Sequence, residues 1–255
     1  MTEKKSNRTN WKPTDKRFVA FIDILGFKDL VSKNNHAEIY EQLSKISKTK
    51  KFLENIAENG KLLEKYKDAE IYIVSFSDSI VIFSKNDDIN NFYFFLIAVR
   101  WLFARTIEAK IPIKGGLAHG EISLNKSEQI YFGQAIIDSY MMEEDVNYIG
   151  AVSHNTIDNY INLNKTELEK TKDRLDELLF EDKTPLKCGN LNHLNLNWFS
   201  KASLLKEELT DEEKTKKINE LITHFKYNTS GSPRKYIDNT IEFFNRNYEN
   251  KKILL

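Results

Sequence analysis

Residues 17–27 read RFVAFIDILGF, and this stretch decides how the rest of the chain is interpreted. The run up to Leu25 is short, almost wholly apolar and rich in β-forming residues, which is typical of a central strand buried on both faces. One residue breaks the pattern, because Asp23 places a carboxylate inside the apolar strand, where an unpaired charge is costly to bury. We therefore expect positive charge near Asp23, and we expect the strand to end at Gly26.

A second acidic residue has a similar setting in residues 70–84, EIYIVSFSDSIVIFS. Two β-rich runs flank a Ser-Asp-Ser centre, and this pattern predicts a hairpin with Asp78 at its middle. Side by side in a sheet, Asp23 and Asp78 would form a site of hard oxygen ligands suited to Mg²⁺ or Mn²⁺. A loop that opens at Gly26 also exposes the amides of Gly26 and Phe27 as phosphate donors. Together these features predict a cradle for a triphosphate.

Each candidate residue also has an ordinary structural explanation. Asp23 could pair with a lysine, and Asp78 could be a turn residue, since Ser-Asp-Ser is common turn chemistry. Lys114 could neutralise phosphates or extend into solvent from a strand end. His119 could be a general base, although a lone histidine more often caps or packs. Tyr140 could stack on a base or belong to the core of its helix.

Strand and helix patterns alternate through the first 160 residues. The expected elements after the first strand are a helix over 27–60 broken near Asn34 and Asn35, the hairpin over 70–84, a helix over 90–109, a strand with three glycines over 111–124, a loop entering a helix over 129–144 and a strand entering a helix over 147–157. This order predicts an α+β sandwich with helices packed on one face of a mostly antiparallel sheet.

Composition divides the chain into three regions. Residues 1–16 are charged and polar, which predicts a flexible lead-in, and residues 17–158 hold the core. From 159 to 255 the sequence shifts to charged segments that predict helices, such as KTELEKTKDRLDELLFED and TDEEKTKKINELITHFKYN. We expect 159–255 to be a mostly helical C-terminal extension.

Bulk properties exclude several classes of partner. The 38 Lys and Arg residues balance 38 Asp and Glu residues, so no net field draws the molecule to nucleic acid or anionic lipid. The longest apolar stretch, 92–103, contains Arg100 and is too short to cross a bilayer, so we expect no membrane span. The single cysteine, Cys188, cannot close an intramolecular disulfide, and the polar start carries no apolar signal core. These features predict a cytoplasmic protein.

Four motifs in this order resemble those of class III adenylate and guanylate cyclases. D-I-L-G-F at 23–27 resembles the first metal motif of the family, and Asp78 falls where its second metal aspartate falls. IKGGLAHGEI resembles its Arg-x-Gly-x-x-x-Gly strand with Lys114 in place of arginine, and YFGQAIIDSYMMEE resembles its glycine-containing turn and following helix. The resemblance covers about residues 17–158.

This resemblance implies a ferredoxin-like cyclase core with a helical C-terminal appendage. It also implies a homodimer with sites at the interface and two Mg²⁺ or Mn²⁺ ions per site. The implied site residues are Asp23, Asp78 and Lys114 for catalysis, Asp23, Ile24 and Asp78 for the metal ions, and Ile24, Gly26, Phe27 and Tyr140 for the nucleotide.

Four positions depart from the purine cyclases. The asparagine and arginine that orient the ribose and stabilise the transition state in that family align with Ile137 and Met141. The residues with which those enzymes recognise the purine align with Val74 and Ile130. Apolar side chains at these positions disfavour purine recognition by hydrogen bonds.

A diverged branch of the family is more similar to this chain. GQAIIDSYMMEE followed by a Gly-Ala-Val-Ser strand resembles the pyrimidine cyclases of bacterial Pycsar anti-phage systems, with Tyr140 and Glu143 at characteristic places. The resemblance implies a lyase that converts UTP or CTP into the 3′,5′-cyclic monophosphate, a second messenger in anti-phage defence. Two alternatives stay open: an inactive nucleotide-binding module that signals through its helical tail, and a diverged purine cyclase.

Overall fold

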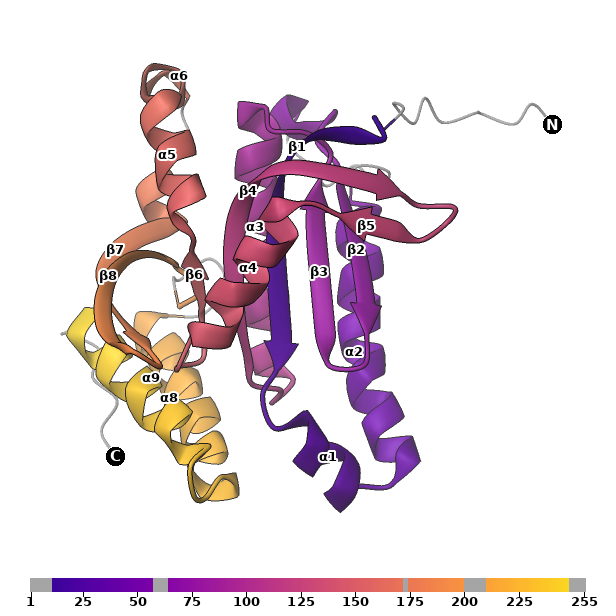
Figure 1. The fold of residues 1–255 in the computed structure, drawn as a ribbon. Coiled ribbons are helices and arrows are strands. Elements are labelled where there is room, and N and C mark those ends of the chain that lie inside the picture. Colours follow the sequence, from indigo (N-terminus) through magenta and orange to yellow (C-terminus); the bar gives the residue numbers. More distant parts are fainter. Residues whose placement is uncertain (1–10, 57–63, 172–173, 200–209, 248–255) are drawn as a thin grey trace.

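The computed structural model describes residues 11–56, 64–171, 174–199 and 210–247, and its centre is an eight-stranded sheet (Figure 1). The strand order is β2-β3-β1-β4-β6-β8-β7, and β5 pairs with β4 beside this path. Only β4 and β6 pair in parallel among the described strands. The strands are β1 Thr14–Ile24, β2 Ile71–Phe76, β3 Ser79–Ser84, β4 Ile113–Asn125, β5 Ile130–Phe132, β6 Ala151–Ser153, β7 Leu179–Leu186 and β8 Gly189–Leu196.

The helices follow the expected order through the first 160 residues. They are α1 Phe27–Lys33, α2 His36–Glu54, α3 Ile89–Glu108, α4 Gln134–Asp145, α5 Asn155–Leu163, α6 Lys165–Lys170, α8 Asp211–Asn228 and α9 Arg234–Asn247, with single 3-10 turns at Glu64–Tyr66 and Leu175–Glu177. The predicted break near Asn34 and Asn35 is confirmed, because Asn35 caps α2 in a capping box with Glu38. The predicted α+β class is also confirmed.

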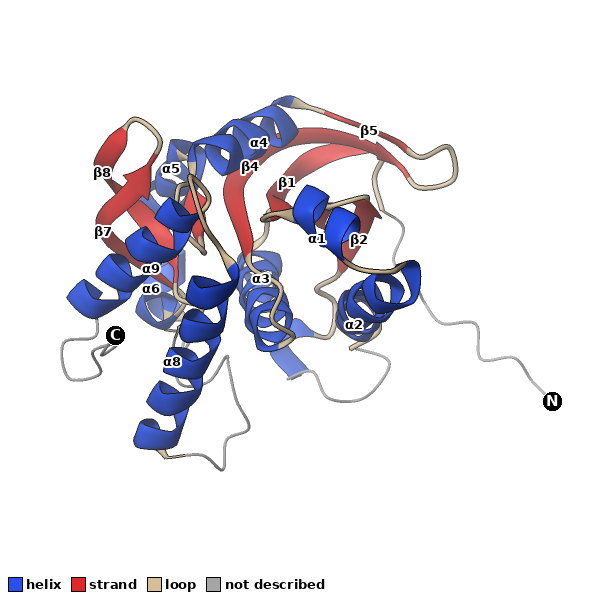
Figure 2. Cartoon of the chain, turned by 90° about the horizontal axis from the view of Figure 1, so that it is seen from below, coloured by secondary structure: helices blue, strands red, loops and turns tan. Residues whose placement is uncertain are grey.

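Helices cover both faces of the sheet, so the expectation that they pack on one face is wrong (Figure 2). Successive strand residues point to opposite faces. A Cβ on Gly115 would lie 3.3 Å from the Phe103 ring of α3, whereas one on Gly116 would lie 2.1 Å from the Ser139 carbonyl oxygen of α4. The glycine pair therefore leaves room for α3 on one face and for α4 on the other.

The central strand β1 is buried on both faces, as its apolar run predicts. Its Ala20, Ile22 and Ile24 side chains join the large core formed with α2 and α3. Val19 joins a smaller cluster on the α4 face, and by alternation Asp23 lies on that same face. The strand therefore carries its carboxylate on the α4 side of the sheet.

The ends of the chain differ from the sequence expectations in two ways. β1 already begins at Thr14, which pairs with Ser123, so residues 14–16 are not part of a flexible lead-in, and residues 1–10 lie outside the described part. Within 159–255, the hairpin β7–β8 joins the sheet through Val152 and Asn195. Where a helix was predicted over 165–182, the described residues form α6 and the 3-10 turn at Leu175–Glu177 before β7 begins.

Leu and Asn alternate with the period of a strand only over residues 194–197, at the end of β8. The boundary expected at residue 158 falls inside α5. Cys188 is exposed between β7 and β8. In the described ranges, no helix combines the length and the apolar character that a bilayer crossing requires.

Candidate active site

The fold brings the two aspartates of the sequence motifs to the same end of the sheet. Asp23 is the penultimate residue of β1, and its Cα pairs with those of Ser79 on β3 and Lys114 on β4. Asp78 lies in the turn between β2 and β3, beside Ser77, whose φ is +57°. The Ile24 amide donates to the Asp78 carbonyl at 3.1 Å, which fixes the hairpin turn to the end of β1.

The chain leaves β1 through a left-handed glycine. Gly26 has φ +73°, and a Cβ there would meet nothing within 4 Å, so the backbone conformation and not space favours glycine. Ile24 is 3% exposed and its side chain lies in the core, so only its main chain can contribute to the site. Phe27 begins α1 and packs partly against the core, which leaves its amide, and not its ring, as the candidate nucleotide contact.

Helix α4 approaches the β4 backbone closely because β4 presents small residues to it. At Gly116 a Cβ would overlap the Ser139 carbonyl and lie 2.7 Å from the Glu143 amide, whereas at Gly120 it would lie 3.4 Å from the Ala135 Cβ. The buried residues of α4 are Ala135, Ser139 and Glu143, spaced four apart along one face of the helix. This close approach places Glu143 over the start of β4.

Lys114 is buried and paired, so the alternative in which it extends into solvent is wrong. The residue is 4% exposed. Its Nζ lies 2.8 Å from Glu143 Oε1 and donates to the Glu143 carbonyl at 2.7 Å and to the Glu144 carbonyl at 3.4 Å. The ion pair and the two hydrogen bonds direct the Lys114 ammonium to the C-terminal end of α4.

Negative charge outweighs positive charge around Asp23. The pKa of Asp23 is raised to about 7, first by burial and then by the charges of Glu143, Asp78 and Glu144, while Lys114 acts to lower it. Burial also raises the pKa of Glu143, opposed by Lys114. A nearby cation favours the ionised form of such a carboxylate, because its attraction offsets the cost of burial and the repulsion by neighbouring carboxylates.

The donor set fits a cation shared with a substrate better than a fully protein-bound one. Across the residues that the structure describes, no group of three or more His, Cys, Asp or Glu side chains is placed to hold a metal ion. Mg²⁺ is commonly held by one or two carboxylates together with substrate phosphates and water. Asp23 and Asp78 supply two carboxylates of that kind.

Tyr140 lies on the outer side of α4 above the same strand. Its ring meets Phe21 edge-on, with centroids 5.2 Å apart, and Phe21 precedes Asp23 by two residues on the same face. Tyr140 remains 45% exposed. The neighbouring Ile137 and Met141 are 51% and 63% exposed, so the outer side of α4 is apolar and open.

The two positions aligned with purine-recognising residues lie on different strands. Val74 is on β2 opposite Val81 and belongs to the small cluster on the α4 face. Ile130 is on β5 opposite Asn125, at the far end of β4 from Lys114 and Asp23. Within one chain Ile130 therefore cannot contact a nucleotide held at Asp23, and it could do so only from a second copy.

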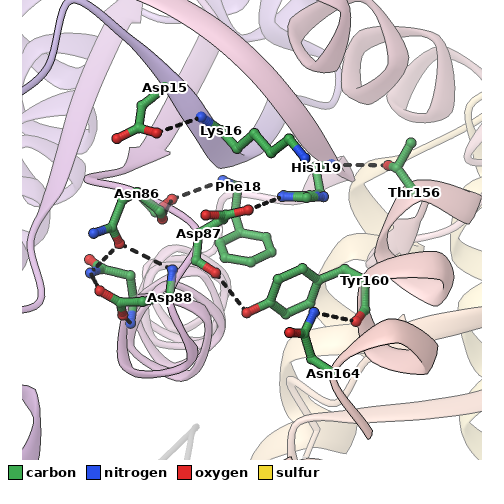
Figure 3. A network of polar contacts seen from close by, with 12 residues as sticks. Asp15, Lys16, Phe18, Asn86, Asp87, Asp88, His119, Thr156, Tyr160 and Asn164 are labelled. Atoms are coloured by element: carbon green, nitrogen blue, oxygen red, sulfur yellow. Dashed lines mark hydrogen bonds and ion pairs between the residues drawn. The ribbon is translucent and has the colours of Figure 1, made fainter. Parts of the chain in front are cut away.

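His119 is not part of this site. It follows Ala118 on β4 and points to the opposite face, where its ring packs on Phe18 at 4.9 Å (Figure 3). Its Nε2 lies 3.0 Å from Asp87 Oδ2, and the Tyr160 hydroxyl donates to the Asp87 carbonyl at 2.7 Å. The side chain of His119 lowers the pKa of Asp87. The histidine thus packs and pairs, as the ordinary alternative predicted, and cannot serve Asp23 as a base.

Glu143 is a neighbour of Asp23 that the sequence analysis named as part of the resemblance but did not assign to the site. Its sequence signal is its spacing, because it falls on the same helix face as Ala135 and Ser139. A carboxylate on the buried face of a helix requires a partner, and the partner is Lys114.

No protein-family model matches the chain, and no curated protein matches its sequence. Its fold is similar to the catalytic core of a rhodopsin-guanylyl cyclase with converted specificity in complex with ATPαS, at 14% identity and TM-score 0.48 over 72% of this chain and 97% of that one. It is also similar to the adenylyl cyclase CyaB from P. aeruginosa, at 10% identity and TM-score 0.48 over 77% and 98% of the two chains. The guanylate cyclase domain of RhGC from Catenaria anguillulae in complex with GTP gives 14% identity and TM-score 0.46 over 71% and 96%.

Proposed function

We propose that the chain is a nucleotidyl cyclase that converts UTP or CTP into the 3′,5′-cyclic monophosphate and pyrophosphate. The observation that carries the proposal is the pair Asp23 and Asp78, joined through the hydrogen bond from Ile24 to Asp78 in a region with excess negative charge. Such a pair suits divalent cations that arrive with a triphosphate.

Asp23, Asp78 and the main chain of Ile24 would hold Mg²⁺ or Mn²⁺, two ions per site. The bound ions supply charge neutralisation on the triphosphate and a lower pKa at the ribose 3′-hydroxyl. The aspartates would hold the triphosphate at the end of β1 through these ions, and the amides of Gly26 and Phe27 would donate hydrogen bonds to its oxygens. These residues orient the nucleotide so that its 3′-oxygen faces the α-phosphorus.

The proposed reaction needs no protein nucleophile. The 3′-oxygen bonds to the α-phosphorus, the bond from that phosphorus to the bridging oxygen breaks, and the hydroxyl proton passes to solvent as pyrophosphate leaves. Positioning and charge neutralisation are the contributions that proteins generally make to phosphoryl transfer. Lys114 acts in this scheme through Glu143 and not by contact with the phosphates.

We further propose a symmetric homodimer with a site at each side of its interface. Large exposed apolar side chains gather on β5 and the outer side of α4: Ile130, Phe132, Ile137, Tyr140 and Met141. Exposed apolar side chains that are clustered in this way favour a protein interface. A second copy packed here would bring its own β5 and α4 to the nucleotide held at Asp23.

The base preference is proposed as pyrimidine, with UTP ahead of CTP. Val74 and Ile130 offer no hydrogen bonds where purine cyclases recognise the base, and a polar base edge normally requires matched polar groups. The resemblance to pyrimidine cyclases extends the proposal to a second messenger in anti-phage defence. Choosing uracil over cytosine rests on that resemblance alone.

One observation favours a second candidate, a catalytically inactive nucleotide-binding module. The outer side of α4 offers Ile137 and Met141 where the purine cyclases have polar transition-state groups. Retention of both aspartates favours turnover instead. A diverged purine cyclase with unusual base contacts is the third candidate.

One assay separates the three candidates. The purified protein is incubated with Mn²⁺ and equal concentrations of the four ribonucleoside triphosphates, and the products are resolved chromatographically. We expect cyclic UMP in excess, cyclic CMP second, and no product from Asp23→Ala or Asp78→Ala, while the exposed Asp68→Ala serves as the matched control. A clear excess of cyclic AMP or cyclic GMP would overturn the pyrimidine preference, and normal activity in either aspartate variant would overturn the metal assignment.

A further inference from the structure

The sheet register sets a lysine directly beside the proposed metal-binding carboxylate. Asp23 and Lys114 are paired across β1 and β4, so their side chains share one face. Side chains directly opposite each other in an antiparallel pair have Cβ atoms roughly 5 Å apart. An ion pair between them is the expected arrangement, and it would neutralise Asp23 and exclude a divalent cation.

The observed arrangement is different. No ion pair joins Asp23 to Lys114 in the described part of the chain. The lysine turns to the end of α4, where Glu143 contributes its carboxylate and its carbonyl, and Glu144 contributes its carbonyl. The C-terminal end of a helix is a favourable place for a cation, because unpaired carbonyls point there.

The contact depends on the short distance between α4 and β4. A Cβ on Gly116 would overlap the Ser139 carbonyl, so glycine at this position allows α4 to pack closely against β4. Glu143 follows Ser139 by one helical turn and is 2% exposed. Helix α4 thus places the buried Glu143 carboxylate next to Lys114, which lies opposite Asp23 across the β1–β4 pair.

We infer that Glu143 is a positioning residue that holds the Lys114 ammonium away from Asp23 and so leaves this carboxylate open to a divalent cation. This inference rests on the proposed function. Glu143 does not bind the cation itself: its partner is the lysine, and the pair as a whole is neutral. Its effect on the reaction is indirect, through the availability of Asp23.

The test measures Mn²⁺ binding to the nucleotide-free protein by the electron paramagnetic resonance signal of free Mn²⁺, at pH 8. We expect Glu143→Gln to weaken binding at least tenfold, because the released ammonium then pairs with Asp23. Adding Lys114→Met to the same chain is expected to restore binding to within about twofold of wild type. A crystal structure of Glu143→Gln should show Lys114 Nζ within ion-pair distance of Asp23.

Glu144→Gln is the matched control for charge alone. Its carboxylate also raises the pKa of Asp23, but it holds Lys114 only through its carbonyl, which the substitution retains. We expect at most a twofold effect on Mn²⁺ binding. Equal losses in Glu143→Gln and Glu144→Gln would overturn the positioning role, and so would wild-type binding by Glu143→Gln or failure of Lys114→Met to restore it.

Loss of one partner from a buried ion pair can unfold a protein. If circular dichroism shows that Glu143→Gln does not fold, the Mn²⁺ binding measurements are repeated with Glu143→Asp, alone and combined with Lys114→Met. The shorter aspartate side chain keeps the charge but lies farther from Lys114. We expect weaker Mn²⁺ binding that Lys114→Met again restores, and unchanged binding would overturn the inference. Equal Mn²⁺ binding by wild type and Asp23→Asn would instead refute the proposed metal site itself, so the two failures are distinguishable.

Discussion

Replacing Asp23 by asparagine should stabilise the metal-free protein while abolishing cation binding. The pKa of Asp23 rises from 3.8 to about 7 on folding, first through burial and then through repulsion by Glu143 and Asp78. This rise corresponds to about 4 kcal/mol of preference for the neutral carboxyl. Since Asp23 is only partly buried and solvent screens its neighbours, we expect about 2 kcal/mol of added stability in Asp23→Asn at pH 8.

The pH dependence follows from the same shift. Between pH 3.8 and about 7 the folded state binds more protons at Asp23 than the unfolded state does, so stability falls as the pH rises through this window. The advantage of the neutral asparagine is therefore largest above about pH 7 and is expected to shrink to below about 1 kcal/mol at pH 5.

Urea unfolding in EDTA at pH 8 and pH 5 measures this difference. The exposed Asp68→Asn is the control and should change stability by less than about 0.5 kcal/mol at either pH. Added Mn²⁺ should stabilise the wild type and leave Asp23→Asn unchanged, because only a protein that binds the ion is stabilised by it. An asparagine variant that is less stable than wild type at pH 8, or equally more stable at both pH values, would refute this reasoning.

Three further outcomes test the architecture around the site. Met141→Glu, on the exposed side of α4, should give a folded monomer without cyclase activity in light-scattering and product assays, and an active monomer would contradict the proposed dimer. Gly116→Ala should lower the free energy of unfolding by about 3 kcal/mol, because the added methyl group would overlap with α4. In Gly120→Ala, whose added Cβ has its nearest contact at 3.4 Å, the free energy of unfolding should change little. Equal effects of the two substitutions would contradict the close approach of α4 to β4. His119→Gln should lower stability by about 1 kcal/mol through loss of the Asp87 contact without changing Mn²⁺ binding, and loss of that binding would place His119 back at the site.

The sequence alone determined the central strand, the hairpin and the pair of aspartates. The apolar run of residues 17–25 admits a buried strand, and Asp23 stands out because a carboxylate there needs a counter-charge. The Ser-Asp-Ser sequence indicated a turn at Asp78, and the Asn pair at 34–35 indicated the helix break at Asn35. These features are encoded over a few neighbouring residues, so one-dimensional patterns suffice to find them.

The tertiary structure alone decided which buried charged side chains contact each other. Lys114 is 91 positions from Asp23 (114 − 23), and nothing local shows that β4 pairs with β1 in the register that aligns them. Nor does the sequence show that Lys114 turns to Glu143, because that choice depends on α4 resting on Gly116. The placement of α4 on the opposite face from α3 and the addition of β7–β8 to the sheet are likewise long-range outcomes. Patterns in sequence predict which side chains are buried, whereas the register and helix packing determine which partner each buried charge finds.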